Sequence, residues 1–157
     1  MLFRRRIQGL LTDSIIDLVP VYLGEVDKEY GFGEVKEWKI TLHGRLREIG
    51  RISLRMGEGP GIYYFGHIGY HIDPPWRGHR YARRACELLR TELNRSGKSS
   101  VVITTDVDNI ASQKTCLVIG AVLERIVDVP VVYQKRWSLS ARKCRYVWKL
   151  GKEYGQR

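Results

Sequence analysis

The chain has 157 residues, and its 28% charged and 43% hydrophobic residues are the balance of an ordinary globular protein. This composition argues against a disordered, a collagen-like or a membrane-spanning chain, and the length suits a single domain, which we expect to span residues 1–157. The unusual quantity is the net charge of +10, from 27 Lys and Arg against 17 Asp and Glu. It predicts an anionic partner, and nucleic acid, an anionic lipid surface and a phosphorylated small molecule all fit it.

The three cysteines form no recognisable metal motif, because they lack both CxxC spacing and a histidine at ligand spacing. We therefore expect no bound metal and a reducing, intracellular compartment. The cysteines are Cys86, Cys116 and Cys144.

Residues 4–6, all arginine, resemble the start of a secretory signal, but Asp13 and Asp17 interrupt the apolar stretch that follows. No apolar run approaches the roughly 20 residues of a membrane-spanning helix, which predicts a cytoplasmic protein without membrane contacts.

The first recognisable elements after the N-terminal segment form a hairpin. Residues 38–42 and 52–56 place apolar side chains at every second position, and Gly44 between them allows the chain to reverse. This pattern predicts two antiparallel strands with one face in water. After a turn at residues 57–61, which contains Gly and Pro, the aromatic and β-branched residues of 62–72 predict a long third strand.

The second half of the chain alternates between helices and strands. Prolines at 74 and 75 end the third strand, and apolar side chains at helical spacing predict a helix from about residue 80 to 97. The apolar run 101–103 predicts a strand that is buried on both faces, and a second helix is expected over about 109–119. Strands follow at 121–127 and 144–150, with a long loop at 128–142 between them.

This order of elements predicts the fold class, which is α/β (α+β). A strand, a helix and a strand in succession require a right-handed parallel crossover, whereas the meander before them is antiparallel. The sheet is therefore expected to be mixed. No internal repeat and no linker divides the chain.

The turn at residues 73–82, DPPWRGHRYA, is the most informative segment because it joins a strand to the start of a helix. Backbone N–H groups and the positive end of the helix dipole converge at such a turn and can hold a phosphate. Arg77, His79 and Arg80 add side-chain charge at the same place. A solvated turn without a ligand fits the segment equally well.

Read together with a second motif, this turn resembles motif A of the GNAT acetyltransferase superfamily: Arg or Gln, two residues, Gly, one residue, then Gly or Ala. Residues 77–82 match it, with Arg80 in place of the usual central glycine. Residues 109–112, followed by Cys116 and Gly120, resemble the family's second motif, with Cys116 in the position of a tyrosine. The strings GHIGYHI, RGHRYARRAC, DNIAS and CRY are similar to an uncharacterised subgroup of that superfamily.

The resemblance covers residues 38–150 and implies a GNAT-like mixed, centrally splayed sheet flanked by helices. It implies an N-acetyltransferase that moves an acetyl group from acetyl-CoA to a primary amine by direct attack in a ternary complex. The acceptor is then a small-molecule amine or a peptide, and the family pattern allows a homodimer. The cofactor-binding residues that the resemblance implies are Tyr70, His71, Ile72, Arg77, Gly78, His79, Arg80, Tyr81, Ala82, Asn109 and Ser112.

Acetyl transfer to an amine needs an oxyanion donor, a base and an acid. The resemblance implies that backbone N–H groups of residues 70–72 hold the thioester oxygen. His67 and His71 are the candidate bases, because histidine titrates near neutrality, and a structural role is the alternative for each. A bulge, which the family often has in this strand, would send the two side chains in different directions. Glu48 is a weaker candidate that would act through water.

The candidate acid is Cys116, which stands where the family has a tyrosine, although an inert buried cysteine is the alternative. Tyr146 on the last strand or Tyr81 would serve instead, and solvent is a third proton source. The acceptor is left open: Arg55 suits an acceptor with a carboxylate, whereas Glu34 and Glu37 suit a cationic amine. Aromatic residues that also border this side are Tyr63, Tyr64, Tyr133 and Trp137.

Two other functions compete with the enzyme. Because Arg80 and Cys116 replace the usual glycine and tyrosine, a domain that binds coenzyme A without catalysis is the first. The second is a basic nucleic-acid-binding module, which the sequence disfavours: it has no zinc knuckle, helix-turn-helix pattern or RRM-like aromatic pair, and its arginines gather at one turn.

Overall fold

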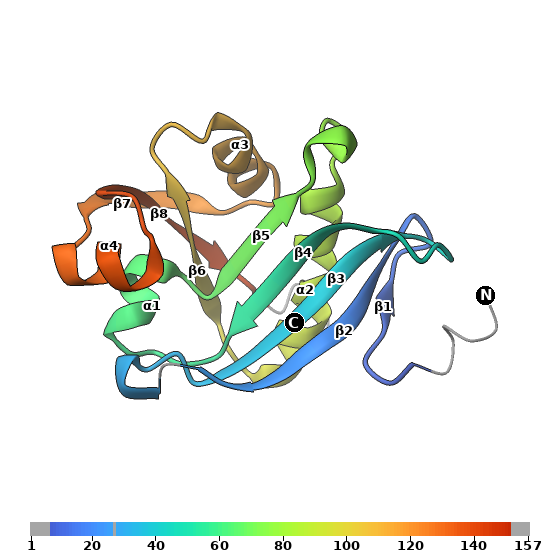
Figure 1. Cartoon of the computed structure of the whole chain (residues 1–157), viewed down its shortest axis with the longest axis horizontal. Helices are drawn as coiled ribbons and strands as arrows, with labels where there is room; N and C mark the ends of the chain where they lie inside the picture. Colours follow the sequence, from blue (N-terminus) through green and yellow to red (C-terminus); the bar gives the residue numbers. More distant parts are fainter. Residues whose placement is uncertain (1–6, 27, 152–157) are drawn as a thin grey trace.

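The structure is a computed structural model that describes residues 7–26 and 28–151, so the basic segment at residues 4–6 lies outside the described residues (Figure 1). Its strands form one open sheet in the order β1-β2-β3-β4-β5-β6-β8-β7. The strands are β1 (Leu11–Thr12), β2 (Ile16–Glu25), β3 (Glu34–Leu42), β4 (Glu48–Arg55), β5 (Ile68–Ile72), β6 (Ser100–Asp106), β7 (Val122–Asp128) and β8 (Arg142–Lys149). The helices are α1 (Pro60–Phe65), α2 (Tyr81–Ser96), α3 (Ile110–Val118) and α4 (Val131–Trp137), with short 3-10 helices η2 (Lys28–Tyr30) and η3 (Pro74–Trp76).

The predicted hairpin is confirmed as β3 and β4, which pair antiparallel from Val35↔Arg55 to Thr41↔Glu48. Gly44 in the connection has φ 73°, a backbone conformation that glycine adopts without steric cost. On the other side, β4 pairs with β5 in an uninterrupted antiparallel register from Gly50↔Ile72 to Leu54↔Ile68. β5 itself therefore contains no bulge.

The sheet is mixed, as predicted, because the crossover through α2 makes β5 and β6 parallel. These two strands share a single register pair, Ile68↔Ile103, and then diverge toward their carboxyl ends, as Figure 1 shows. β6 instead pairs along its whole length with β8, from Ser100↔Lys149 to Asp106↔Lys143. Beyond Ile68, the edge of β5 that faces β6 has no strand partner within the described residues.

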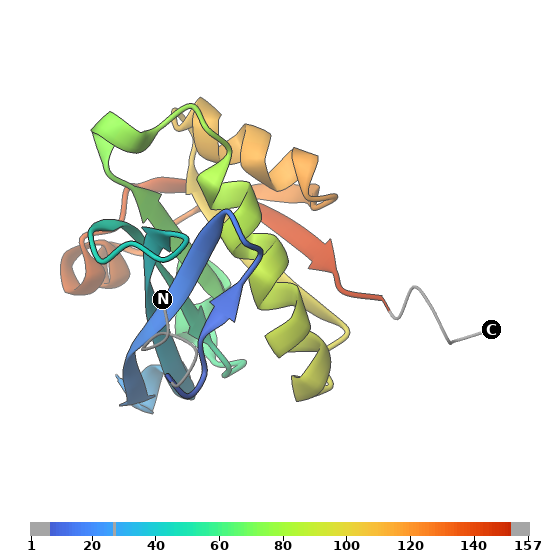
Figure 2. The same ribbon diagram turned by 90° about the vertical axis from the view of Figure 1, so that its right-hand side faces the viewer.

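Helix α2 lies across one face of the sheet, and α3 lies beside it (Figure 2). The apolar stripe of α2 is fully buried against strand residues, which is why the helical spacing in the sequence predicted its position correctly. Each such leucine contributes about 2 kcal/mol by its burial. The buried residues of the stripe are Ala85, Cys86, Leu89 and Leu93.

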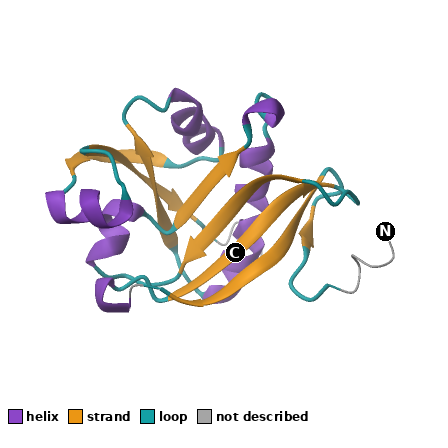
Figure 3. Ribbon diagram, in the orientation of Figure 1, coloured by secondary structure: helices purple, strands orange, loops and turns teal. Residues whose placement is uncertain are grey.

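The long third strand predicted over residues 62–72 is wrong in its first half. Residues 60–65 form α1, and the strand proper begins only at Ile68 (Figure 3). Pro60 suits the first turn of a helix, and Gly66, with φ 83°, ends it. Of the aromatic residues that favoured a strand, Phe65 packs against Trp137 and Tyr64 against Tyr133, both of α4, so tertiary contacts override their local propensity.

The predicted loop at 128–142 and the unassigned N-terminal segment also contain regular structure. Residues 131–137 form α4, whose Tyr133 and Trp137 rings stack with centroids 4.9 Å apart. β1 and β2 extend the sheet, and the register of β2 against β3 shifts between Pro20 and Tyr22. Proline at such an irregularity interrupts the alternation by which a strand is recognised. None of the helices in the described ranges is long and apolar enough to cross a bilayer.

Candidate active site

A cleft of about 590 Å³ opens where the carboxyl end of β5, the start of α2 and one face of α3 meet. Ten of the eleven residues predicted to bind the cofactor line this large cleft, and His79 is the one that does not. The remaining lining residues were not predicted: Trp76, Arg83, Ala111, Lys114, Thr115 and Val118. The four from α3 follow the helical spacing i, i+3, i+4, i+7, a signal that was present in the sequence.

The start of α2 has the geometry of an anion-binding helix terminus. Arg80 precedes the first helical residue with φ 63° and ψ 26°, the left-handed conformation, and makes no side-chain capping bond to the helix. The N–H groups of the first helical turn therefore have no side-chain acceptor from this residue. Arg80 thus keeps the left-handed backbone that the family's usual glycine favours, and Gly78 nearby has φ 87°.

Positive side chains surround this helix start. Arg77, Arg80 and Arg83 line the large cleft, and Lys114 faces them from α3. Arg77 also fixes the turn, because its Nε donates to the carbonyl oxygen of Ile72 at 2.8 Å. Arg84, the next arginine of the helix, pairs instead with Asp13 at 2.9 Å.

Helix α3 is capped by a residue of the second motif. The Asn109 Oδ1 atom accepts a hydrogen bond of 3.1 Å from the backbone N–H of Ser112, the standard bond of an N-cap asparagine. This bond satisfies one of the free N–H groups at the helix start and fixes the position of Asn109 beside the large cleft.

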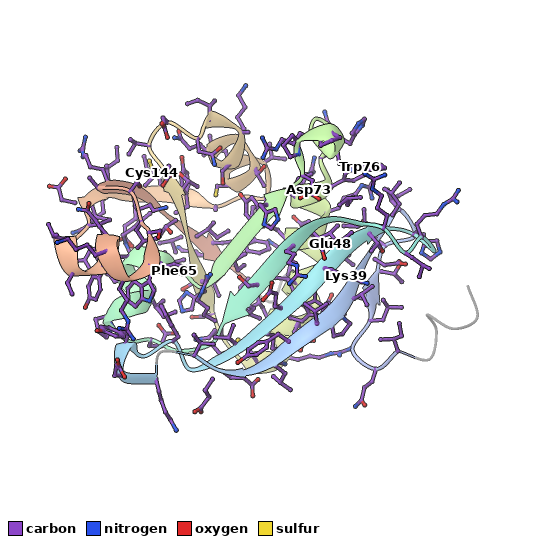
Figure 4. The ribbon with its side chains drawn as sticks, in the orientation of Figure 1. Lys39, Glu48, Phe65, Asp73, Trp76 and Cys144 are labelled. Carbon is purple, nitrogen blue, oxygen red and sulfur yellow. The ribbon has the colours of Figure 1, made fainter. Side chains whose placement is uncertain are left out.

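A second, smaller cavity of about 210 Å³ adjoins the cleft where β5 and β6 diverge. Tyr70, Asn109 and Ser112 line both spaces. Figure 4 places Phe65, which lines the small cavity, and Trp76, which lines the large cleft, toward opposite ends of β5. The other residues around the small cavity are Arg55, Ile68, Gly69, Ile103, Thr104, Thr105, Asp106, Leu139 and Lys143.

The Tyr70 side chain forms the wall between the two spaces. Its hydroxyl donates to the carbonyl oxygen of Ser112 at 3.3 Å and lies 2.9 Å from the Ser112 Oγ atom. The same hydroxyl is 4.0 Å from the Cys116 Sγ atom. Burial raises the pKa of Tyr70 well above its usual value, so the group stays protonated. A tyrosine hydroxyl from β5 therefore lies next to Cys116, the residue of α3 that stands at the tyrosine position of the family motif.

Of the three predicted acids, Tyr81 lines the large cleft, whereas Cys116 and Tyr146 line neither space. Cys116 is fully buried in the core, and burial raises the pKa of its thiol to about 11. Tyr146 is also a core residue, and burial raises its pKa as well. The sequence identified Tyr70 only as a backbone contact, because nothing in strand alternation reveals that its hydroxyl reaches α3.

The structure separates the two histidines that were predicted as bases. His67 precedes β5 and is buried; its Nδ1 accepts from the Val102 N–H at 2.9 Å, and its Nε2 lies 3.1 Å from the Gly57 carbonyl oxygen. Burial lowers the pKa of His67, and both ring nitrogens are used by the fold. His71 is exposed and lines the large cleft, with Nε2 3.6 Å from Asp73 Oδ1.

Glu48, the third predicted base, is held by an arginine of its own strand. Arg51 donates to the Glu48 carboxylate at 3.0 and 3.1 Å, and these bonds lower the pKa of Glu48. Arg51 also donates to Glu37 at 3.0 Å. One guanidinium therefore holds both carboxylates, and its bonds to Glu48 make that group a weaker base. Within the described residues no group of three or more His, Cys, Asp and Glu side chains is arranged to hold a metal.

Comparison with known proteins connects this geometry to one family. Residues 16–122, more than half of the chain, match the model of the acetyltransferase (GNAT) domain. No curated protein matches the sequence. Among solved structures, a probable acetyltransferase of the GNAT family from Chromobacterium violaceum is similar over 92% of this chain and 87% of its own, with a TM-score of 0.65 and 13% identity.

Two further structures belong to named acetyltransferases. The microcin C7 self-immunity acetyltransferase MccE, in complex with acetyl-CoA and AMP, has a TM-score of 0.57 and 21% identity over 73% of this chain and 61% of its own. The ribosomal-protein-S5-alanine acetyltransferase from Vibrio fischeri has a TM-score of 0.59 and 16% identity over 75% and 63%. The chain thus spans less than two thirds of the length of these two proteins. Because the fold agrees and the family model covers most of the chain, the protein belongs to the GNAT acetyltransferase family.

Proposed function

We propose that the protein transfers the acetyl group of acetyl-CoA directly to a primary amine while both are bound. The observation that carries the proposal is the large cleft, where the uncapped start of α2 and several cationic side chains meet the carboxyl end of β5. Membership of the GNAT family and the acetyl-CoA bound to MccE support the choice of donor.

The start of α2 is the binding site for the donor's phosphates. Backbone N–H groups of the first helical turn and the helix dipole favour negative charge there. Arg80 and Arg83 add charge from the same turn, and Lys114 adds charge from α3. These cations account for part of the net charge of +10, so less of that charge is left to indicate nucleic acid as the partner.

The unpaired edge of β5 receives the pantetheine arm and the thioester. Because β5 pairs with β6 only at Ile68, backbone groups of residues 69–72 on that edge, apart from the Ile72 carbonyl that Arg77 occupies, can bind the arm as a neighbouring strand would. Backbone N–H groups near Tyr70 stabilise the negative charge that develops on the thioester oxygen, and such donors are typically worth about 3 kcal/mol. Asn109 and Ser112 border the arm from α3.

His71 acts on the proton of the acceptor amine, and Tyr70 acts on the leaving thiolate. His71 lies in the large cleft, beside the reacting strand, and takes the proton that the amine loses. Tyr70 stands between the two spaces, and its protonated hydroxyl turns from the Ser112 carbonyl oxygen to donate a hydrogen bond to the leaving thiolate, while the Ser112 hydroxyl donates to Tyr70. The thiolate then takes its proton from solvent. The acceptor's amino group then lies on the side of the large cleft, beside His71, and the small cavity beyond Tyr70 holds the rest of the acceptor.

Two measurements test this function in sequence. Acetyl-CoA is first titrated into the protein in a calorimeter, and thiol release is then followed over a panel of polyamines, aminoglycosides, amino acids and peptides. Saturable binding followed by amine-dependent thiol release is the expected result. Absence of binding would overturn the proposal, whereas binding without release by any amine would favour a coenzyme A-binding domain without catalysis.

A further inference from the structure

Arg55 lines the small cavity at the end of β4, where its contacts with the described residues are made to neutral groups. Its guanidinium stacks on the Phe65 ring, 3.9 Å from the ring centroid. It donates to the carbonyl oxygen of Gly66 at 3.1 Å and to the Ser53 Oγ atom at 3.3 Å. Both acceptors are neutral, and no carboxylate in the described part of the chain forms an ion pair with Arg55.

Two carboxylates near Arg55 in the fold, Asp106 and Glu37, form ion pairs with other cations. Asp106, which also lines the small cavity, pairs with Lys143 at 2.6 Å and accepts from the Ser140 hydroxyl at 2.7 Å. Glu37, on the strand next to β4, accepts from Arg51. The ionised side chains that line the small cavity are therefore Arg55, Lys143 and Asp106, and one positive charge is left over.

A desolvated cation without a counter-ion is unfavourable for a folded protein, unless a ligand supplies the missing charge. Burial lowers the pKa of Arg55 to about 9, and the negative charge of Glu37 opposes this only in part. The group remains charged at neutral pH. Perturbed, uncompensated groups of this kind gather at binding sites, where stability is lost in exchange for ligand recognition.

The shape of the site suits a carboxylate. A guanidinium presents parallel N–H donors that match the two oxygens of a carboxylate. Gly69 of β5 makes room for it: a Cβ atom at this position would lie 3.0 Å from the Arg55 Nη2 atom. Gly69 directly precedes Tyr70, so the Arg55 guanidinium lies beside the part of β5 where the acceptor amine must attack.

We propose that the acceptor is an amine that carries a carboxylate close to its amino group, and that Arg55 binds this carboxylate in the small cavity. The inference rests on the proposed acetyl transfer and adds the substrate class. Free amino acids and peptides with an acidic first residue share this chemistry. The alternative left open by the sequence, a cationic acceptor held by Glu34 or Glu37, is disfavoured because neither lines the small cavity.

The first experiment needs no variant. Thiol release is measured for amino acids, each compared with its carboxamide and with the amine that lacks the carboxylate, and rates are corrected for the fraction of neutral amine. A second comparison uses peptides that begin with Glu against peptides that begin with Gln. A third comparison uses β-alanine against O-phosphoethanolamine. We expect kcat/KM to be about 10- to 100-fold higher for the carboxylate member of a pair, the value of one charge-assisted hydrogen-bonded contact.

The second experiment assigns the preference to Arg55. Arg55→Gln and Arg55→Met should reduce the ratio of kcat/KM between acid and amide to about one, without change in acetyl-CoA affinity. Arg55→Lys should keep part of the ratio. Arg145→Gln is the matched control, because Arg145 is a buried arginine that pairs with Glu124 and lines neither space. It should lower the melting temperature and leave the ratio unchanged.

The outcomes separate this inference from the proposed function. Equal use of acids, amides and simple amines would overturn the carboxylate site and leave acetyl transfer standing. Preference for O-phosphoethanolamine over β-alanine would overturn the identity of the anion. Failure to bind acetyl-CoA would overturn the proposed function itself. If the ratio of kcat/KM between acid and amide stays high in Arg55→Gln and Arg55→Met, Arg55 does not bind the carboxylate.

Discussion

The hydroxyl oxygen of Tyr70 lies 2.9 Å from the hydroxyl oxygen of Ser112, in the wall between the large cleft and the small cavity. Tyr70 comes from β5 and Ser112 from α3, so the contact joins the strand that precedes the first motif to a residue of the second motif. Cys116, the residue that replaces the family's tyrosine, is beneath this contact, with its sulfur 4.0 Å from the Tyr70 hydroxyl.

This arrangement predicts that Tyr70→Phe lowers kcat about 100-fold, because the leaving thiolate loses its hydrogen-bond donor. The acetyl-CoA dissociation constant should change little, since the ring and its packing are kept. Steady-state kinetics and calorimetry measure the two quantities. Cys116→Ala is the control and should leave kcat within a few fold. The opposite pattern, with Cys116→Ala inactive and Tyr70→Phe active, would restore the thiol as the acid.

Gly78 and Gly120 form a matched pair for testing the large cleft. Both have positive φ, 87° and 95°, and a Cβ at either would meet no atom within 4 Å. Replacement by Phe should therefore destabilise both variants by a similar amount, about 1 kcal/mol, through backbone strain alone. Only Gly78 lines the large cleft, so only Gly78→Phe should abolish acetyl-CoA binding. If Gly78→Phe folds and still binds acetyl-CoA, the phosphate site is wrong.

Arg80 is expected to combine backbone strain with cofactor binding. Arg80→Gly should raise the free energy of unfolding by about 1 kcal/mol, because glycine adopts the left-handed conformation without penalty. The same change should weaken acetyl-CoA binding about tenfold or more, since a charged contact to phosphate is lost. Denaturant titration and calorimetry measure the two effects.

Ser138→Gly provides the control for Arg80. Ser138 also has a left-handed backbone, with φ 53°, and it ends α4 away from the large cleft. Its replacement should give the gain in stability without the loss of affinity. Unchanged affinity in Arg80→Gly would mean that Arg80 contributes only its backbone to the site.

His67 and His71 should differ in their effect on stability and on rate. Burial lowers the pKa of His67 in the folded protein, so the unfolded chain binds the proton more readily. Stability is then complete above the unfolded value of about 6.5 and falls as pH drops below it. His67→Gln should remove this acid loss and should reduce stability at pH 7.5 by about 2 kcal/mol, because a buried N–H loses its acceptor.

His71→Gln should instead leave the melting temperature at pH 7.5 nearly unchanged, because the side chain is exposed, and lower kcat about 100-fold. Thermal unfolding from pH 5 to 8 and pH–rate profiles distinguish the two variants. A kcat that falls in His67→Gln and not in His71→Gln would reverse the assignment of the base.

The sequence by itself determined the elements whose signal is local. Helical spacing located α2, alternation located β3 and β4, and the strand, helix and strand order required the parallel crossover at β5 and β6. These elements follow from spacing along the chain, because backbone geometry repeats with a fixed period. The family resemblance, and not spacing, supplied the residues of β5 that line the large cleft and most of those from the turn and the start of α2.

Only the tertiary structure decided which side chains meet. The aromatic run before β5 became α1 because Trp137, more than 70 residues later, packs against it. His67 and Cys116 were removed from the candidate site by burial, which depends on elements distant in sequence. Tyr70 reaches Ser112, and Arg55 lacks a carboxylate, for the same reason: contacts across a sheet are set by its order and divergence, and no local period encodes them.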